Sequence, residues 1–152
     1  MSSSKRVRKA STSNPVEFGF KDVKPLNYIQ GVYLEAIRNN DVIFGIGSAG
    51  TGKTYIAASY AAGELFHRRI QKIILTRPNV ETGRGLGFLP GDLSEKYAPY
   101  LQPFEQIFSR SLGKGFYEYA LKNGDIDPKP LGFMRGSTFE NCILLIDECQ
   151  QM

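Results

Sequence analysis

One stretch decides the fold of this sequence: Val42-Ile43-Phe44-Gly45-Ile46-Gly47-Ser48-Ala49-Gly50-Thr51-Gly52-Lys53-Thr54. Its first five residues form a short apolar run, which is typical of a strand buried on both faces. Its last eight match the pattern G-x-x-x-x-G-K-[ST] at every position, and the alanine-rich segment that follows favours a helix. A buried strand, a glycine-rich turn and a helix in this order predict a phosphate-binding loop (P-loop) and disfavour an accidental glycine turn.

Each residue type in the predicted loop has a physical task. Glycine lets the backbone wrap closely around an anion and supplies positive φ where it is needed. The amides of residues 49–54 then point at the anion, and the helix adds its positive end. Lys53 places a compact charge against the β and γ phosphates of ATP, and the Thr54 hydroxyl is a ligand for Mg²⁺. We expect the nucleotide to be bound by Gly47, Ser48, Ala49, Gly50, Thr51, Gly52, Lys53, Thr54 and Tyr55.

An acidic pair, Asp147-Glu148, follows another strong apolar run, Cys142–Ile146. The end of a strand would aim Asp147 at the magnesium ion, and Glu148 would orient and activate a water molecule for attack on the γ-phosphorus. Alone, such a pair is more often a polar cap of the strand, but the P-loop upstream favours the catalytic interpretation. A water-activating carboxylate also favours a hydrolase over the third possibility, a phosphotransferase.

The remaining segments predict alternating helices and strands. Apolar residues between Leu26 and Asn40 fall on one helical face, and Lys72–Thr76 is a second buried strand. Strands that alternate with helices indicate an α/β fold, with a mainly parallel sheet and helices on both faces. Further expected elements are the loop Asn79–Leu93, a helix starting at Pro103, a helix Phe116–Lys122 capped by Asn123-Gly124, and a short strand Leu131–Phe133.

Length and composition fit a soluble globular protein with one domain. The 152 residues carry a net charge of +4, and four of the nineteen Lys and Arg fall within residues 1–14. The remainder contains fifteen basic and fifteen acidic residues and therefore carries no net charge. We expect residues 1–14 to be a disordered basic tail, which could touch nucleic-acid phosphates or merely be solvated, and 15–152 to be the folded domain. No apolar run approaches the ~20 residues that cross a bilayer, and the two cysteines flank one predicted strand. We therefore expect no membrane partner and a reducing cytoplasm.

Three further polar side chains are candidates for ligand contact. Gln30 lies on the helix before the first strand, and its amide could pair with both the acceptor and the donor of adenine; alternatively it is a surface glutamine. Arg77 and Arg135 each follow a strand-like run, where ligands of α/β sheets bind. Either could contact the phosphates of nucleotide or nucleic acid, or could pair with an acid at the surface. The lone His67 is interpreted as a solvated helix cap.

Five blocks of sequence carry a resemblance to a known family. In chain order they are Gly47–Thr54, Leu75–Pro78, Leu86–Leu93, Met134–Thr138 and Asp147–Gln150. Together they resemble the PhoH-like family, phosphate-starvation-inducible ATPases of bacteria and bacteriophages. The likeness covers residues 15–152, and the block Leu86–Leu93 is rare outside that family.

The resemblance implies a RecA-like domain related to superfamily 1 helicases, which hydrolyses ATP with Mg²⁺ and has a suspected role on RNA or single-stranded DNA. It implies adenine contact by Gln30, magnesium binding by Thr54 and Asp147, and water activation by Glu148. Arg77 would match a position near the nucleic-acid path. Relatives also suggest a homo-oligomeric ring if the missing C-terminal part is present, and a location in the cytoplasm of a bacterium or of a phage-infected host.

The sequence departs from the family pattern at several positions. Arg84, Gly85, Ser137 and Cys149 replace residues that family members usually have, which puts loop contacts in doubt more than nucleotide binding. In this fold class a further strand inserts between the Asp-Glu strand and the P-loop strand, whereas here the sequence ends four residues after Glu148. We therefore expect a C-terminally truncated family member with two unpaired strand edges. The alternative function is a fragment that binds nucleotide or a partner without catalysis.

Overall fold

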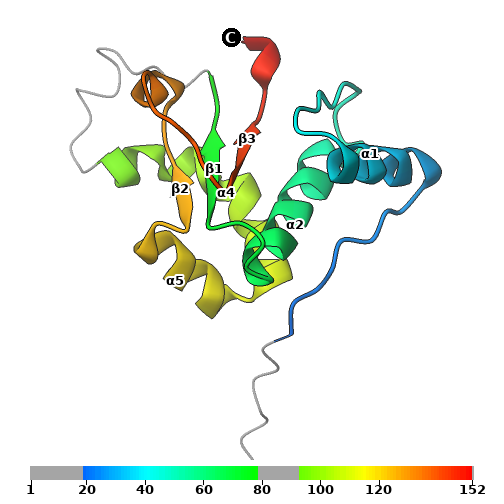
Figure 1. Cartoon of the computed structure of the whole chain (residues 1–152), viewed down its shortest axis with the longest axis horizontal. Coiled ribbons are helices and arrows are strands. Elements are labelled where there is room, and N and C mark those ends of the chain that lie inside the picture. The colour runs from blue at the N-terminus through cyan, green and yellow to red at the C-terminus, as the bar shows by residue number, and fades with distance from the viewer. Residues whose placement is uncertain (1–18, 79–92, 152) are drawn as a thin grey trace, which may run out of the picture.

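The structure is a computed structural model that describes residues 19–78 and 93–151. The predicted basic tail (1–14) lies outside these residues, as does all but the last residue of the predicted loop Asn79–Leu93. Within the described residues, helices alternate with parallel strands (Figure 1), which confirms the predicted α/β fold class.

A three-stranded parallel sheet is the framework of the molecule. Its strands are β1 (Lys72–Thr76), β2 (Ile126–Pro128) and β3 (Cys142–Ile146), in the order β2-β1-β3. β1 is the central strand, because Ile73 pairs with β2 on one side and with β3 on the other. The bounds of β1 and β3 are those that the sequence predicted. β2 was not predicted, because three residues that include a proline give no strand pattern.

The two helices around the glycine-rich loop confirm the sequence-based predictions. α1 (Tyr28–Asn39) begins after Asn27, whose side chain accepts a hydrogen bond from the amide of Gln30 at 2.9 Å. α2 (Lys53–Phe66) begins directly after Gly52. Figure 1 shows α2 between the sheet and α1, and the small side chains of α2 let it pack closely against β1.

Two further helices, α4 (Leu93–Leu112) and α5 (Lys114–Asn123), complete the core. The prediction that a helix starts at Pro103 is wrong, because α4 already begins at Leu93 and contains Pro99 and Pro103. Burial explains how the helix continues through both prolines: Tyr97, Phe104 and Phe108 are almost inaccessible and lie at the spacing of one helical face. α5 is followed by Gly124, which has φ 81° and forms the predicted glycine cap.

The hydrophobic core lies between the sheet and the helices α2, α4 and α5. Ile73 and Leu75 of β1 belong to it, together with Ile126 of β2. A second, smaller cluster of Val23, Leu34 and Ile56 joins α1 to α2. The helical members of the main cluster are Ala58, Ala61, Ala62, Leu65, Phe104, Phe108, Leu112, Tyr117 and Ala120.

The segment Val42–Ile46, predicted as a buried strand, is neither buried nor paired with another strand in the described part of the chain. Val42, Phe44 and Ile46 are 75%, 73% and 94% exposed. The segment runs through the cyan loop beside α1 in Figure 1. An apolar run shows that a segment can be buried, but burial also needs neighbours on both sides. The Tyr33 ring lies against Gly45, where its hydroxyl would be 2.8 Å from an added Cβ.

The prediction of a strand at Leu131–Phe133 is also wrong. Leu131–Met134 forms a short 3-10 helix, η1, that starts after Pro130. Three apolar residues are too few to distinguish a strand from a single helical turn. A second 3-10 helix, η2 (Cys149–Gln151), follows the acidic pair.

Candidate nucleotide-binding site

The glycine-rich loop before α2 contains two left-handed residues. Gly50 has φ 75° and Gly52 has φ 86°, a conformation that residues with a Cβ rarely adopt. A Cβ at Gly52 would also lie 2.7 Å from Gln30 Nε2. Both positions therefore require glycine, and the loop leads directly into the N-terminus of α2, where unpaired amides favour an anion.

Lys53 folds back over this loop. Its ammonium group donates hydrogen bonds to the carbonyl oxygens of Gly47 at 2.8 Å and Ser48 at 2.7 Å. Thr51 Oγ1 donates to the same Ser48 carbonyl at 2.9 Å. The lysine charge is thus held at the loop by the loop's own backbone.

Thr54 and Asp147, the predicted magnesium ligands, contact each other although they lie 93 positions apart: Thr54 Oγ1 donates to Asp147 Oδ1 at 3.0 Å. Thr54 is in the first turn of α2, and Asp147 directly follows β3. The Asp147 amide donates to the Thr76 carbonyl at 3.0 Å. This bond continues the pairing of β1 with β3 and fixes the backbone that carries the carboxylate.

The Thr54 hydroxyl and the Asp147 carboxylate fit a magnesium ion. Mg²⁺ prefers hard oxygen ligands and usually takes only one or two carboxylates, completing its shell with phosphates and water. The described residues contain no group of three or more His, Cys, Asp and Glu that could hold a metal. The donor set therefore suits an ion that arrives with a phosphate ligand, and not an all-protein metal cage.

Glu148, the predicted water-activating residue, lies next to this pair and is exposed. Its φ of 58° places it in the left-handed region, which costs a non-glycine residue roughly 1–2 kcal/mol. Its carboxylate accepts a hydrogen bond from Gln150 Nε2. Strained residues of this kind cluster at functional sites.

Gln30 connects α1 to the glycine-rich loop. Its side chain is buried; Nε2 donates to the Thr51 carbonyl at 3.1 Å, and Oε1 accepts from the Leu26 amide at 2.8 Å. The alternative of a surface glutamine is therefore wrong. The structure places Gln30 at the predicted nucleotide site, where both ends of its side-chain amide are hydrogen-bonded to backbone groups.

The remaining predicted loop residues differ in their surroundings. Ser48 and Ala49 are exposed, as is expected of positions whose backbone amides and not side chains would bind phosphate. Tyr55 is half-buried and packs against the cluster of Val23, Leu34 and Ile56. Its side chain therefore supports the packing of α1 on α2.

Arg77 pairs with an acid, which was one of its predicted alternatives, but the acid is the predicted magnesium ligand Asp147. Its Nε and Nη2 atoms donate to Asp147 Oδ2 at 2.9 and 2.6 Å. Thr76 and Ile146 are register partners at the ends of parallel strands, so the residues that follow them emerge side by side. The sequence alone does not show that these two strands are neighbours. Tyr97 was missed as well, and its buried hydroxyl accepts from the Arg77 amide at 3.0 Å.

Arg135, the other arginine with a predicted ligand role, is exposed and directly follows η1. No contact joins it to Thr54 or Asp147 among the described residues. His67, predicted as a helix cap, does cap the C-terminus of α2, and its ring also contacts Phe20 and Phe66 with centroids 5.3 Å apart in each case.

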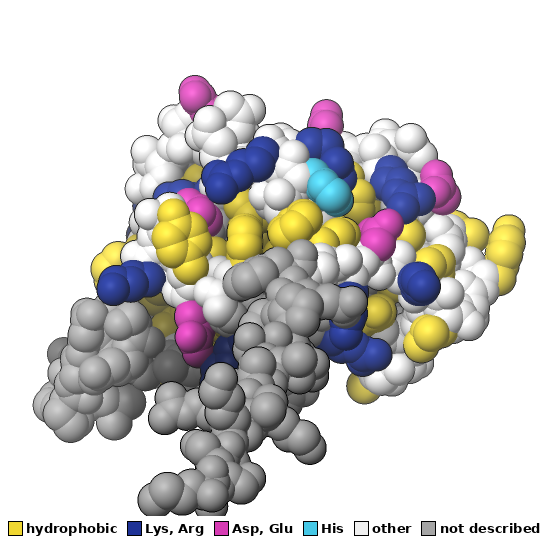
Figure 2. Space-filling view, turned by 90° about the horizontal axis from the view of Figure 1, so that it is seen from below, with side chains coloured by type: hydrophobic (Ala, Val, Ile, Leu, Met, Phe, Trp, Pro, Cys, Tyr) yellow, Lys and Arg dark blue, Asp and Glu magenta, His cyan; other side chains and the backbone are white. Residues whose placement is uncertain are grey.

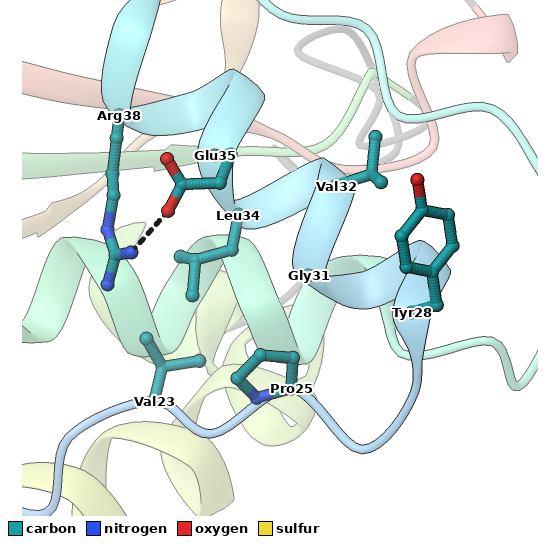
Figure 3. Close-up of a pocket in the computed structure, with 8 residues that line it drawn as sticks. All are labelled: Val23, Pro25, Tyr28, Gly31, Val32, Leu34, Glu35 and Arg38. Carbon is teal, nitrogen blue, oxygen red and sulfur yellow. Dashed lines mark hydrogen bonds and ion pairs between the residues drawn. The ribbon is translucent and has the colours of Figure 1, made fainter.

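A separate apolar cavity of about 520 Å³ lies beside α1. In Figure 3, Tyr28 stands at one end of it and the Glu35–Arg38 ion pair, 2.7 Å long, at the other. None of the residues that line it belongs to the predicted nucleotide site. The cavity is therefore not part of the candidate site.

The family comparison bears directly on this site. The family model described as "PhoH-like protein" matches residues 22–152, which include the loop, Arg77 and the acidic pair. The chain belongs to the PhoH-like protein family. The predicted membership is confirmed, and with it a P-loop NTPase-like domain.

Curated PhoH proteins are similar over most of this chain. Protein PhoH of Escherichia coli (strain K12) is 42% identical over 137 residues, covering 87% of this chain and 39% of its own length. The PhoH-like protein of Bacillus subtilis (strain 168) is 45% identical over 130 residues, which cover 86% of this chain and 41% of that protein. The PhoH-like protein of Synechocystis is 41% identical over 128 residues, which cover 84% of this chain and 39% of that protein. The chain thus spans about two fifths of the length of these PhoH relatives.

Two surface properties bear on partners of this PhoH-like chain. No helix among the described residues is long and apolar enough to span a membrane. Figure 2 views the end of the molecule remote from the glycine-rich loop, where the visible Lys and Arg side chains are interspersed with acidic and apolar ones. Some of the chain's basic side chains are ion-paired, such as Arg69 with Glu64 at 2.7 Å. A nucleic-acid backbone is usually followed by a continuous basic band, which the described part of this face does not display.

Proposed function

We propose that this chain binds ATP with Mg²⁺ at the loop Gly47–Thr54 and hydrolyses it. The observation that carries the proposal is the 3.0 Å contact of Thr54 with Asp147. A hydroxyl at the start of a phosphate-loop helix and a carboxylate at a strand end are the two groups that such sites use for the metal.

Phosphate binding would fall to the loop amides and to Lys53. The left-handed glycines keep the loop free of side chains, and α2 adds its positive end. Lys53 would exchange the carbonyls of Gly47 and Ser48 for phosphate oxygens, which offer a stronger, charge-assisted bond. Ser48 and Ala49 would contribute backbone amides, and Gln30 would contact adenine after exchanging a backbone partner.

The hydrolytic step would depend on Glu148. When bound, Mg²⁺ neutralises developing charge on the phosphates, and Thr54 and Asp147 would hold it. The exposed Glu148 carboxylate would accept a proton from the attacking water, after releasing Gln150. This assignment favours transfer of the phosphoryl group to water over transfer to an acceptor.

Two observations support the alternative of a non-catalytic nucleotide-binding or partner-binding fragment. The Glu148 carboxylate is already hydrogen-bonded to Gln150, and Val42–Ile46 has no strand partner among the described residues. The activity of whole PhoH proteins is a proposal for this chain, because it spans only about two fifths of their length. Remodelling of RNA or single-stranded DNA, contact by Arg135, a ring-shaped oligomer and a cytoplasmic location also remain proposals.

Two substitutions test the site. Lys53→Ala should weaken ATP binding roughly 10- to 100-fold, since a charge-assisted hydrogen bond contributes about 1.5–3 kcal/mol, whereas Glu148→Gln should keep binding and stop hydrolysis. Binding is measured by calorimetry, and hydrolysis by phosphate release. Lys114→Ala, in an exposed ion pair with Glu118, is the control and should match the parent. Equal ATP affinity of Lys53→Ala and the parent would refute the site assignment.

The same phosphate-release measurement separates the enzyme from the fragment. Turnover by the parent chain that disappears in Glu148→Gln supports hydrolysis. ATP binding without turnover supports the fragment. Appearance of the phosphoryl group on an acceptor instead of in water would favour a phosphotransferase.

A further inference from the structure

Asp147 already has a cation beside it. The guanidinium of Arg77 places two donors on the single oxygen Oδ2, at 2.9 and 2.6 Å. The other oxygen, Oδ1, accepts from Thr54. Each oxygen of the carboxylate proposed to bind magnesium therefore has a partner within the protein.

The backbones of both residues are fixed, so a change at this pair involves side chains. The Arg77 amide donates to the hydroxyl of the buried Tyr97 at 3.0 Å, and the Asp147 amide donates to the Thr76 carbonyl at 3.0 Å. The Arg77 side chain is still 25% exposed. It can leave the carboxylate by rotating its own bonds, with no movement of β1 or β3.

A guanidinium and a divalent cation compete for the same carboxylate. Like charges repel at short range, and the repulsion is stronger in partly buried surroundings than in water. The two guanidinium donors on Oδ2 also occupy lone pairs of that oxygen that a metal would use. Metal binding at Asp147 therefore has to displace or weaken the bond to Arg77.

We propose that Arg77 is the resident counter-ion of the metal-binding carboxylate, and that its displacement sets how much Mg²⁺ the site requires. This inference rests on the proposed function, because it takes Asp147 as the metal ligand. Arg77 is a positioning residue in this role: it holds the Asp147 carboxylate in place and balances its negative charge until metal and nucleotide arrive. The nucleic-acid contact that the sequence suggested for Arg77 stays a separate proposal.

The test measures metal binding directly. ATP with a fluorescent N-methylanthraniloyl group is mixed with the full chain, and Mg²⁺ is titrated in. A second titration adds Mn²⁺ to the nucleotide-free chain and follows bound metal by its paramagnetic resonance signal. Both are done for the parent, Arg77→Met, Arg77→Lys and the control Lys129→Met. Lys129 forms a comparable, partly exposed ion pair with Asp127 at 2.7 Å.

Arg77→Met should lower the half-saturating concentrations of Mg²⁺ and Mn²⁺ roughly tenfold, since one charge-assisted interaction is released. Arg77→Lys keeps the positive charge but loses the two-donor geometry of the guanidinium. Its half-saturating metal concentrations should therefore fall less, by about threefold. Lys129→Met should match the parent. If Arg77→Met does not fold, as judged by circular dichroism, Arg77→Lys decides.

Unchanged or higher half-saturating concentrations in the folded Arg77 variants would overturn the inference. A parent that binds no fluorescent nucleotide would instead refute the proposed function. The Mn²⁺ titration still decides the role of Arg77 in that case, because it needs no nucleotide. If neither the parent nor its Arg77 variants bind Mn²⁺ without nucleotide, the Mg²⁺ titration with fluorescent ATP decides, because the site suits an ion that arrives with a phosphate ligand. Chains that bind neither Mn²⁺ nor nucleotide would overturn the inference as well.

Discussion

At the scale of single residues, Gln30 shows how one amide can connect two parts of a site. It accepts from the Leu26 amide before α1 and donates to the Thr51 carbonyl in the glycine-rich loop. Its Nε2 also occupies the space where a Cβ on Gly52 would lie. The side chain therefore holds the loop against α1, whatever contact it makes with a nucleotide.

Replacement of Gln30 by Leu should lower the free energy of unfolding by about 1 kcal/mol, because two backbone groups lose a hydrogen-bond partner while the volume is kept. Chemical denaturation of the nucleotide-free chain measures the change. Arg38→Gln, which breaks only the exposed ion pair with Glu35, is the control and should cost less than about 0.5 kcal/mol. A loss in Gln30→Leu no larger than in the control would contradict the connecting role.

At the scale of elements, the packing of α5 on α4 affects the titration of a tyrosine. The Tyr117 ring stacks on Phe108 with centroids 6.0 Å apart, and burial, with a smaller contribution from Glu105, raises the pKa of Tyr117 to about 12. In the unfolded chain the same hydroxyl ionises near pH 10. Above that pH the unfolded state loses its proton first, so stability falls as the pH rises from 10 to 12.

Tyr117→Phe should remove this loss and leave the ring stacking intact. Relative to the parent, the variant should gain roughly 2 kcal/mol in free energy of unfolding as the pH rises from 10 to 12, with no such gain below pH 10. Urea denaturation at a series of pH values measures the difference. Tyr119→Phe, at a more exposed position of the same helix, should follow the parent. Parallel curves for Tyr117→Phe and the parent would disprove the expectation.

The sequence predicted the elements with strong patterns and missed those that depend on tertiary contacts. β1 and β3 were found because each contains a continuous apolar run, Ile73–Leu75 in β1 and Cys142–Ile146 in β3. The start of α4 was missed because its prolines oppose a helix locally, and only burial of Tyr97, Phe104 and Phe108 overrides them. In the site, the contact of Thr54 with Asp147 was predictable from the motifs. The Arg77–Asp147 pair was not, because it depends on which strands are neighbours.

At the scale of the whole molecule, the exposed segment Val42–Ile46 and the outer strand β3 leave apolar surface in contact with water. Ile46 is 94% exposed, and Leu144 and Ile146 of β3 are 36% and 37% exposed. Apolar groups near a strand edge favour association with other chains. We therefore expect this apolar surface to promote self-association in concentrated solution. We expect this effect to matter more there than the stability of the core.

Ile46→Thr should reduce concentration-dependent self-association and change the free energy of unfolding by less than about 0.5 kcal/mol, because the side chain makes little packing contact. Sedimentation velocity at several concentrations measures the first quantity, and chemical denaturation the second. Ile74→Thr, at a position that is 2% exposed, should instead destabilise the chain by about 2 kcal/mol or more. Unaltered association of Ile46→Thr would show that this surface is not responsible.

The strand order β2-β1-β3 also determines which parts of the molecule unfold locally and which unfold only with the whole domain. Both edges of β1 are hydrogen-bonded to neighbours, and Ile73, Ile74 and Leu75 are at most 2% exposed. In deuterium oxide, the amides of this strand should exchange only when the whole domain unfolds, whereas those of Val42–Ile46 should exchange by local fluctuation. The strand that presents Arg77 is thus the last to open, while the segment that leads into the glycine-rich loop opens without disturbing the core.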